Sequence, residues 1–121
     1  MTKNQVNDPT SLEATLRAAF AGVNAYDPDA IMANWNRDGV YHNPNVGPAA
    51  KGYADVRERM VKLCEGVKSR GEQIIVDRVT HGGRHVIAEW HVEPRNGKDG
   101  VHVADFDNEG KLIQVRVFPR G

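Results

Sequence analysis

The chain has little of several residue types that mark common classes of protein. Its 121 residues include a single cysteine, Cys64, so no disulfide can form within the chain and a reducing compartment is favoured. Sixteen basic residues balance sixteen acidic ones, and no basic block offers a surface for nucleic acid or anionic membrane. No stretch approaches membrane-spanning length, and the first ten residues lack the apolar segment of a signal peptide. We therefore expect a cytoplasmic protein that binds neither nucleic acid nor membrane.

The length and composition are those of one ordinary globular domain. The chain is 40% hydrophobic and 26% charged, and it is long enough for one core but not two. We expect an N-terminal tail over residues 1–9 and a single domain over residues 10–121. Three segments in the first half have apolar residues at helical spacing. The expected helices begin near Thr10 or Ser11, at Asp27 with Ile31 and Trp35 on one stripe, and at residue 53, the last ending near Gly66.

The second half of the chain changes to a period of two, which is typical of strands. Turn residues separate four alternating segments: "EQIIVDRVTH", "HVIAEWHVE", "GVHVADF" and "KLIQVRVF". A shorter strand, "GVYHNP", lies among the helices and ends at Pro44, and "NPNVGPAAKG" is expected to be loop. Helices first and an antiparallel meander afterwards predict an α+β fold.

One hairpin predicts a specific cluster of polar residues. Asn96-Gly97 between alternating segments is the strongest short hairpin signal, because both central residues of a type I′ turn need a positive φ. A two-residue turn would place Arg95 opposite Lys98, so that the numbers of paired residues sum to 193. His91 would then lie opposite His102, with Glu89 diagonal to His102 on the same face.

The two faces of the sheet have competing interpretations. Alternation alone makes the face of Val86, Ala88, Trp90 and Val92 the core and leaves the histidines solvated. The predicted register instead groups the histidines with apolar residues of the last strand, as a ligand pocket requires. The opposite face would then carry an apolar patch suited to a homodimer interface. That patch consists of Trp90, Val101, Val103 and Phe118.

Two stretches, "FAGVNAYDPDAIMANWNRDGVYHNPNVGPAAKGYADVRERM" and "VADFDNEGKLIQVRVF", resemble the nuclear-transport-factor-2-like superfamily. Within it the chain is most similar to the SnoaL-like polyketide cyclase and ketosteroid isomerase group. The resemblance covers about residues 10–119. It implies a cystatin-like α+β roll, in which three helices pack on the concave face of a cone-shaped curved antiparallel sheet. It also implies a deep apolar pocket and often a dimer formed through the sheets.

The resemblance assigns positions to several residues of this chain. Asn43 stands where ketosteroid isomerases have their catalytic aspartate, and Ala19 and His102 stand where they have their oxyanion-hole residues. Tyr41-His42-Asn43 matches the Tyr-x-Asn with which limonene epoxide hydrolase holds a water. A pair of pocket histidines is similar in kind to that of scytalone dehydratase. These similarities imply that Glu89, His91 and His102 lie on the concave face.

The expected site would perform acid–base chemistry without a cofactor. His91 and His102 would transfer protons, and Glu89 would orient one imidazole. Zinc or iron bound by these three residues is a competing interpretation, although we expect no metal. The expected function is that of an isomerase, cyclase, dehydratase or epoxide hydrolase for a small apolar oxygenated compound; the alternative is a non-catalytic ligand-binding or dimerisation domain. The predicted substrate-binding residues are Tyr41, Asn43, Trp35, Ile87, Val115 and Val117.

Overall fold

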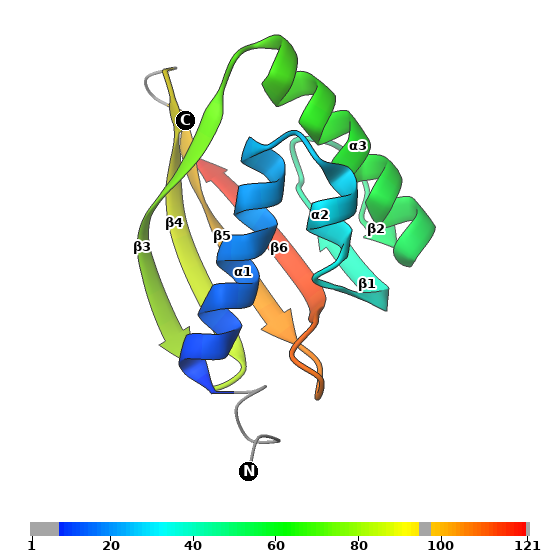
Figure 1. Ribbon diagram of the computed structural model, residues 1–121, viewed down its shortest axis with the longest axis vertical. Coiled ribbons are helices and arrows are strands. Elements are labelled where there is room, and N and C mark those ends of the chain that lie inside the picture. The colour runs from blue at the N-terminus through cyan, green and yellow to red at the C-terminus, as the bar shows by residue number, and fades with distance from the viewer. Residues whose placement is uncertain (1–7, 95–97, 121) are drawn as a thin grey trace.

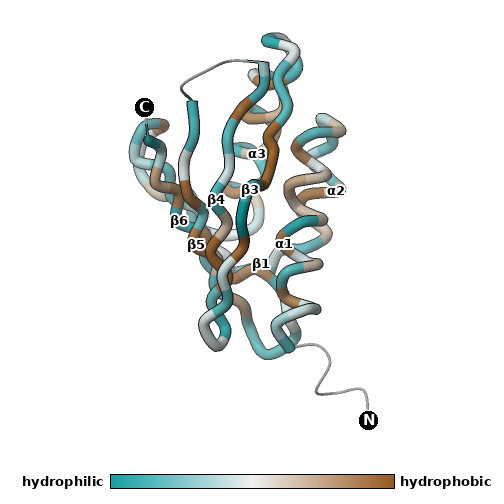
Figure 2. Tube along the Cα trace, turned by 90° about the vertical axis from the view of Figure 1, so that its left-hand side faces the viewer, coloured by the Kyte–Doolittle hydropathy of each residue, from teal (hydrophilic) through white to brown (hydrophobic). Residues whose placement is uncertain are grey.

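The protein forms two layers, with three helices packed on one face of a curved six-stranded sheet (Figure 1). The structure is a computed structural model that describes residues 8–94 and 98–120. Figure 2 shows the layers from the side, with α1 and α2 on one side of the molecule and β5 and β6 on the other. The expected α+β fold is confirmed. The elements are α1 (Pro9–Asn24), α2 (Pro28–Met32), β1 (Trp35–His42), β2 (Ala50–Lys51), α3 (Tyr53–Ser69), β3 (Gln73–Gly82), β4 (His85–Glu93), β5 (Asp99–Phe106) and β6 (Leu112–Arg120).

Both N-terminal helices begin with an aspartate cap followed by proline. The Asp8 carboxylate accepts a hydrogen bond from the Ser11 amide at 2.8 Å, so α1 begins earlier than the expected cap at Thr10 or Ser11. Asp27 caps α2 as expected, through a 3.2 Å hydrogen bond from the Ala30 amide. The prediction that Ile31 and Trp35 lie on one helical stripe is wrong, because α2 ends at Met32 and Trp35 begins β1.

The end of α3 lies a turn beyond the expected end near Gly66. Gly71 follows the helix with φ of +64°, a left-handed conformation that glycine adopts without a steric penalty. The amide of Gly71 donates to the carbonyl of Lys68, and the amide of Glu72 donates to the carbonyl of Val67. These two hydrogen bonds form a Schellman motif. The motif turns the chain sharply, and the hydrogen bond to Val67 holds the backbone of Glu72 against the last turn of α3.

The sheet has the strand order β2-β1-β6-β5-β4-β3. The expected antiparallel meander is confirmed as β3 to β6, and β1 joins it by pairing parallel to β6. The short strand β2 lies within the segment expected to be loop, where Ala50 pairs with Tyr41 and Lys51 with Val40. Two residues have no periodicity, so only the tertiary pairing defines β2.

The register between β4 and β5 differs from the predicted one. His102 pairs with Ala88 and His91 pairs with Asp99, so the numbers of paired residues sum to 190 and not 193. The expected turn at Asn96-Gly97 lies outside the described residues. A shift by an odd number of positions moves side chains to the opposite face of the sheet. The predicted pairing of His91 with His102 is therefore wrong.

Trp90 explains why the strands adopt this register. Its indole lies over Gly100, where an added Cβ would approach the ring to within 2.6 Å. Only a glycine at this paired position leaves room for the indole to lie across β5 on the helix-covered face. Val86, Ala88 and Val92 are buried on the same face, as the alternation of β4 alone indicates. The large apolar side chains of β4 therefore belong to the core, and its polar ones to the outer face.

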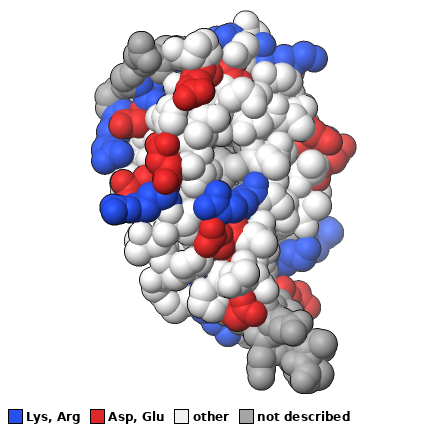
Figure 3. Space-filling view, turned by 60° about the vertical axis from the view of Figure 1, so that its left-hand side comes forward, with Lys and Arg blue, Asp and Glu red and all other residues white. Residues whose placement is uncertain are grey.

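The outer face accordingly carries a different set of residues from the one expected. Trp90 is not part of the apolar patch predicted there, whereas Val101, Val103 and Phe118 are. Figure 3 shows acidic and basic side chains interspersed on the side of the molecule that it draws. Over the described part of the chain, no helix combines the length and apolar character needed to cross a membrane.

Candidate functional site

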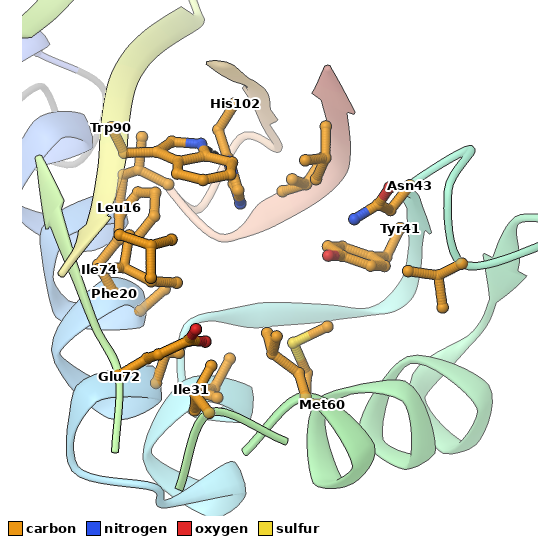
Figure 4. Close-up of a pocket in the computed structure, with 18 of the residues that line it drawn as sticks. Leu16, Phe20, Ile31, Tyr41, Asn43, Met60, Glu72, Ile74, Trp90 and His102 are labelled. Carbon is orange, nitrogen blue, oxygen red and sulfur yellow. Dashed lines mark hydrogen bonds between the residues drawn. The ribbon is translucent and has the colours of Figure 1, made fainter. Parts of the chain in front are cut away.

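A cavity of about 210 Å³ lies between the helices and the inner face of the sheet (Figure 4). Its wall is mainly apolar, with contributions from all three helices and from strands β1, β3, β4, β5 and β6. A small number of polar groups interrupt this wall, as is usual for a small-molecule site. The polar and aromatic lining residues are Phe20, Trp35, Tyr41, Asn43, Arg70, Glu72, Trp90, Lys98 and His102.

His102 lies on the inner face of β5, opposite Ala88 and Val117. Its Nδ1 accepts a 2.8 Å hydrogen bond from the indole N–H of Trp90. Since the indole can only donate, Nδ1 must be unprotonated, and in the neutral ring the hydrogen is on Nε2. Figure 4 shows the ring directed into the cavity, so Nε2–H is a hydrogen-bond donor toward any ligand.

The surroundings of His102 keep the imidazole neutral. The ring packs against Phe20, with ring centroids 4.8 Å apart, and meets Trp90 edge to face. Part of the side chain borders the cavity, yet burial in protein lowers the pKa of His102 from 6.5 to about 4. At neutral pH this residue is therefore suited to donate a hydrogen bond to a developing negative charge, and poorly suited to accept a proton.

Tyr41 and Asn43 form a second polar group, at the end of β1. Tyr41 is buried on the inner face, opposite Val115 of β6. Burial raises the pKa of the Tyr41 hydroxyl, and a side-chain hydrogen bond with Asn43 opposes this effect. The side-chain oxygen of Asn43, Oδ1, also accepts a 3.0 Å hydrogen bond from the backbone amide of Asn45, and this bond orients the Asn43 side chain. The hydroxyl therefore remains protonated at neutral pH and faces the cavity (Figure 4).

Glu72 is the carboxylate of the cavity, and the sequence analysis did not identify it. The residue is 2% exposed, and its Oε1 accepts from Nε of Arg70 at 2.8 Å. The Arg70 guanidinium packs closely over Gly66, where an added Cβ would lie 3.1 Å from it. Glu72 and His102 point into one cavity, and the Tyr41 hydroxyl enters it from the other side (Figure 4). The sequence "SRGE" indicates only that Gly71 can end a helix, and it does not mark the acidic residue that follows as buried.

Two of the three residues predicted to be catalytic lie on the outer face. His91 contacts Asp77 through Nδ1 at 2.8 Å and Glu93 through Nε2 at 2.9 Å, and these carboxylates raise its pKa. Glu89 lies 3.7 Å from Arg78 on the same face. The prediction that His91 and Glu89 line the cavity is therefore wrong, and so is a ligand set shared with His102. Among the described residues, no group of three or more histidine, cysteine, aspartate or glutamate side chains is placed to bind a metal ion.

The predicted substrate-binding residues divide in a similar way. Ile87 pairs with Val103 on the outer face, so its prediction as part of the pocket wall is wrong. The odd register shift accounts for this error as well. The other five lie on the cavity, and their role in binding a ligand stays a prediction. These five are Trp35, Tyr41, Asn43, Val115 and Val117.

The fold and cavity define a class of cone-shaped α+β proteins that enclose a pocket. The family model of the SnoaL-like domain matches residues 16–115. The chain therefore belongs to the SnoaL-like family, within the nuclear-transport-factor-2-like superfamily. Comparison with curated proteins finds no significant match.

Solved structures share this fold at low sequence identity. A SnoaL-like protein of unknown function from Burkholderia thailandensis has a TM-score of 0.80 and 15% identity, covering 94% of this chain and 98% of that one. The epoxide hydrolase/cyclase-like enzyme SalBIII, which acts in pyran ring formation in the polyether salinomycin, has a TM-score of 0.78 and 21% identity over 93% of each chain. A protein from Kribbella flavida that carries the provisional name ketosteroid isomerase has a TM-score of 0.72 and 18% identity, covering 91% and 78%.

Proposed function

We propose that the protein is a cofactor-free enzyme that moves a proton on a small, largely apolar, oxygenated molecule. The observation that carries this proposal is a buried carboxylate, Glu72, facing two neutral hydrogen-bond donors across an apolar cavity. Glu72 is the general base, and it removes a proton from carbon next to a carbonyl group. The N–H of His102 and the hydroxyl of Tyr41 stabilise the negative charge that develops on the carbonyl oxygen.

The environment of each group supports its role. A mainly apolar cavity strengthens hydrogen bonds to a developing oxyanion, because the effective dielectric constant is lower there than in water. His102 is held as a donor by Trp90, so it needs no rearrangement when the charge forms. Structures with the same fold bear names of ketosteroid isomerase and epoxide hydrolase/cyclase type, so the fold is compatible with acid–base catalysis on small organic molecules. Isomerisation or ring closure of a carbonyl compound is therefore the reaction type we propose.

Exchange of deuterium for carbon-bound hydrogen tests the proposal directly. A panel of cyclic ketones and enones is incubated with the protein in D₂O, and loss of the α-proton signal is followed by NMR. Replacing Glu72 by glutamine removes the base and should slow exchange by about 10²–10⁴-fold. Replacing His102 by glutamine or Tyr41 by phenylalanine weakens oxyanion stabilisation and should slow exchange by about 10–10³-fold.

A matched control comes from the outer face. Glu89→Gln makes the same chemical change as Glu72→Gln on the side of the sheet away from the cavity, so exchange should be unaffected. Circular dichroism and thermal unfolding establish that each variant is folded. Exchange that proceeds as fast in Glu72→Gln as in the wild type would refute the proposal.

Binding without turnover is a second candidate, favoured by the ion pair that Arg70 forms with Glu72. A guanidinium beside a carboxylate makes the carboxylate a weaker base. On this alternative the protein would bind members of the panel, detected by calorimetry, and catalyse exchange in none of them.

A further inference from the structure

A second hollow of about 200 Å³ adjoins the cavity beneath α3. It shares several lining residues with the main cavity, so the two spaces meet along this wall. The shared residues are Tyr41, Asn43, Val46, Leu63 and Arg70. The remaining lining residues are Arg59, Lys62 and Gly66, all from α3.

The wall of this second hollow is cationic. Arg59, Lys62 and Arg70 line it. Arg59 and Lys62 are three residues apart and emerge from neighbouring positions on the surface of α3, and Arg70 is the residue that follows the helix. No aspartate or glutamate is among the described residues that line it. Arg70 is partly neutralised by Glu72, whereas Lys62 forms no ion pair with any residue that the structure describes. Three like charges on one small hollow repel one another unless an anion lies between them.

Arg59 provides the most specific evidence. Its Nη2 donates to the carbonyl of Pro48 at 2.8 Å, which fixes the direction of the guanidinium. Its Nη1 is buried and has no hydrogen-bond partner within the described part of the chain. A buried donor without an acceptor is unfavourable, and it is more so when it carries charge. Arg59 and Tyr41 both line this hollow, and the positive charge of Arg59 partly offsets the rise that burial causes in the pKa of Tyr41.

We propose that this second hollow binds the carboxylate of the ligand, through Arg59 and Lys62. The substrate is then an amphipathic organic acid, with its charged end against α3 and its apolar body in the main cavity. The shared wall of Tyr41, Asn43 and Leu63 allows one molecule to occupy both spaces. This inference rests on the proposed function only in treating the ligand as a substrate, because the anion site itself is a matter of binding.

A pair of probes that differ only in charge tests the site. Naphthylacetate has an apolar ring system and a carboxylate, and naphthylacetamide has the same ring system and a neutral amide. Affinities are measured by isothermal titration calorimetry at neutral pH. The acid should bind at least about tenfold more tightly than the amide, since charge-assisted hydrogen bonds are stronger than neutral ones. This preference should decrease as salt concentration rises.

Variants on one helix separate a specific site from general electrostatic attraction. Arg59→Gln and Lys62→Gln should each reduce the preference for the acid by about three- to tenfold and leave amide affinity unchanged. Lys68→Gln is the matched control, because Lys68 lies on α3, is exposed and lines neither space. Arg59→Gln removes a hydrogen bond to the carbonyl of Pro48 and so can loosen the segment around Pro48. Lys62 is exposed, like Lys68, so Lys62→Gln tests the site without this effect.

Three results would overturn the proposal: equal affinity for acid and amide, an equal loss in Lys68→Gln, or no binding of the acid at millimolar concentration. The outcome is separable from that of the exchange assay. Loss of the preference for the acid leaves Glu72-dependent exchange of neutral ketones standing, and absence of exchange leaves the anion site standing.

Discussion

Protonation of His102 should destabilise the folded protein at mildly acidic pH. Its pKa is about 4 in the folded state and about 6.5 when the chain is unfolded. The unfolded state therefore binds the proton more tightly, so the stabilising contribution is complete above 6.5 and is lost as pH falls toward 4. The difference between the two pKa values corresponds to about 3 kcal/mol in total.

About 2 kcal/mol of this contribution should already be lost at pH 5, where the unfolded ring is charged and the folded one is not. Water in the cavity can partly solvate the charged ring, so this figure is an upper value. The assay is urea unfolding followed by circular dichroism at about pH 8 and about pH 5, for the wild type and for His102→Gln. Glutamine can still accept the hydrogen bond from Trp90, but it does not titrate.

The comparison of two proteins removes the effects of other groups. His91, for example, has a raised pKa, so its contribution is complete below 6.5 and is lost as pH rises through that pKa, which is the opposite sign. Such effects are common to the wild type and to His102→Gln and cancel in the difference. An equal loss of stability in the two proteins between pH 8 and pH 5 would refute the reasoning, as would an NMR titration of His102 with a midpoint near 6.5.

Three further predictions concern the sheet. Replacing Gly100 by alanine should reduce the free energy of unfolding by about 1–3 kcal/mol, because the added Cβ would lie 2.6 Å from the ring of Trp90; unchanged urea unfolding would contradict this packing. We propose that the outer apolar patch forms a homodimer interface, because Phe118 is 49% exposed. Phe118→Glu should give a monomer in sedimentation experiments, and a monomeric wild type would exclude the dimer. NMR titration should give His91 a pKa above 6.5 that falls in Glu93→Gln, and no change in this variant would exclude their pairing.

The order of elements could be predicted because most of them are long and amphipathic. The stripe of α3 and the alternation of β3 to β6 extend over many residues, so tertiary context does not override them. The strand β2 could not be predicted, since its two residues become a strand only by pairing with β1. The family resemblance supplied the position of the helices on the sheet, which periodicity alone does not give.

The site was only partly predictable, because two local rules conflicted in β4. The Asn96-Gly97 turn rule paired His91 with His102, and together with the family resemblance it favoured His91 inside, whereas alternation favoured Trp90 inside. The structure follows alternation, since each buried apolar side chain contributes about 1.5–3 kcal/mol and β4 buries several of them. Alternation in β4 does not by itself place His102. The histidine lies on the inner face because the observed register pairs it with Ala88.

Glu72 illustrates a different limit. In a sequence, an acidic residue after a glycine is typical of an exposed turn, and nothing local indicates burial. Its place in the cavity depends on the Schellman motif at the end of α3 and on Arg70, which reaches back across Gly66. Such a position is a property of three-dimensional packing, and periodicity does not contain it.

The hydrogen bond between Trp90 and His102 gives the protein an optical reporter. The chain has two tryptophans, Trp35 and Trp90, and both line the cavity. The tryptophan fluorescence of the protein therefore arises from indoles at the site, and one of them is hydrogen-bonded to the titrating imidazole. Entry of a ligand, or protonation of the ring, changes the emission without any label, so substrates can be sought by a spectroscopic screen before any reaction is known.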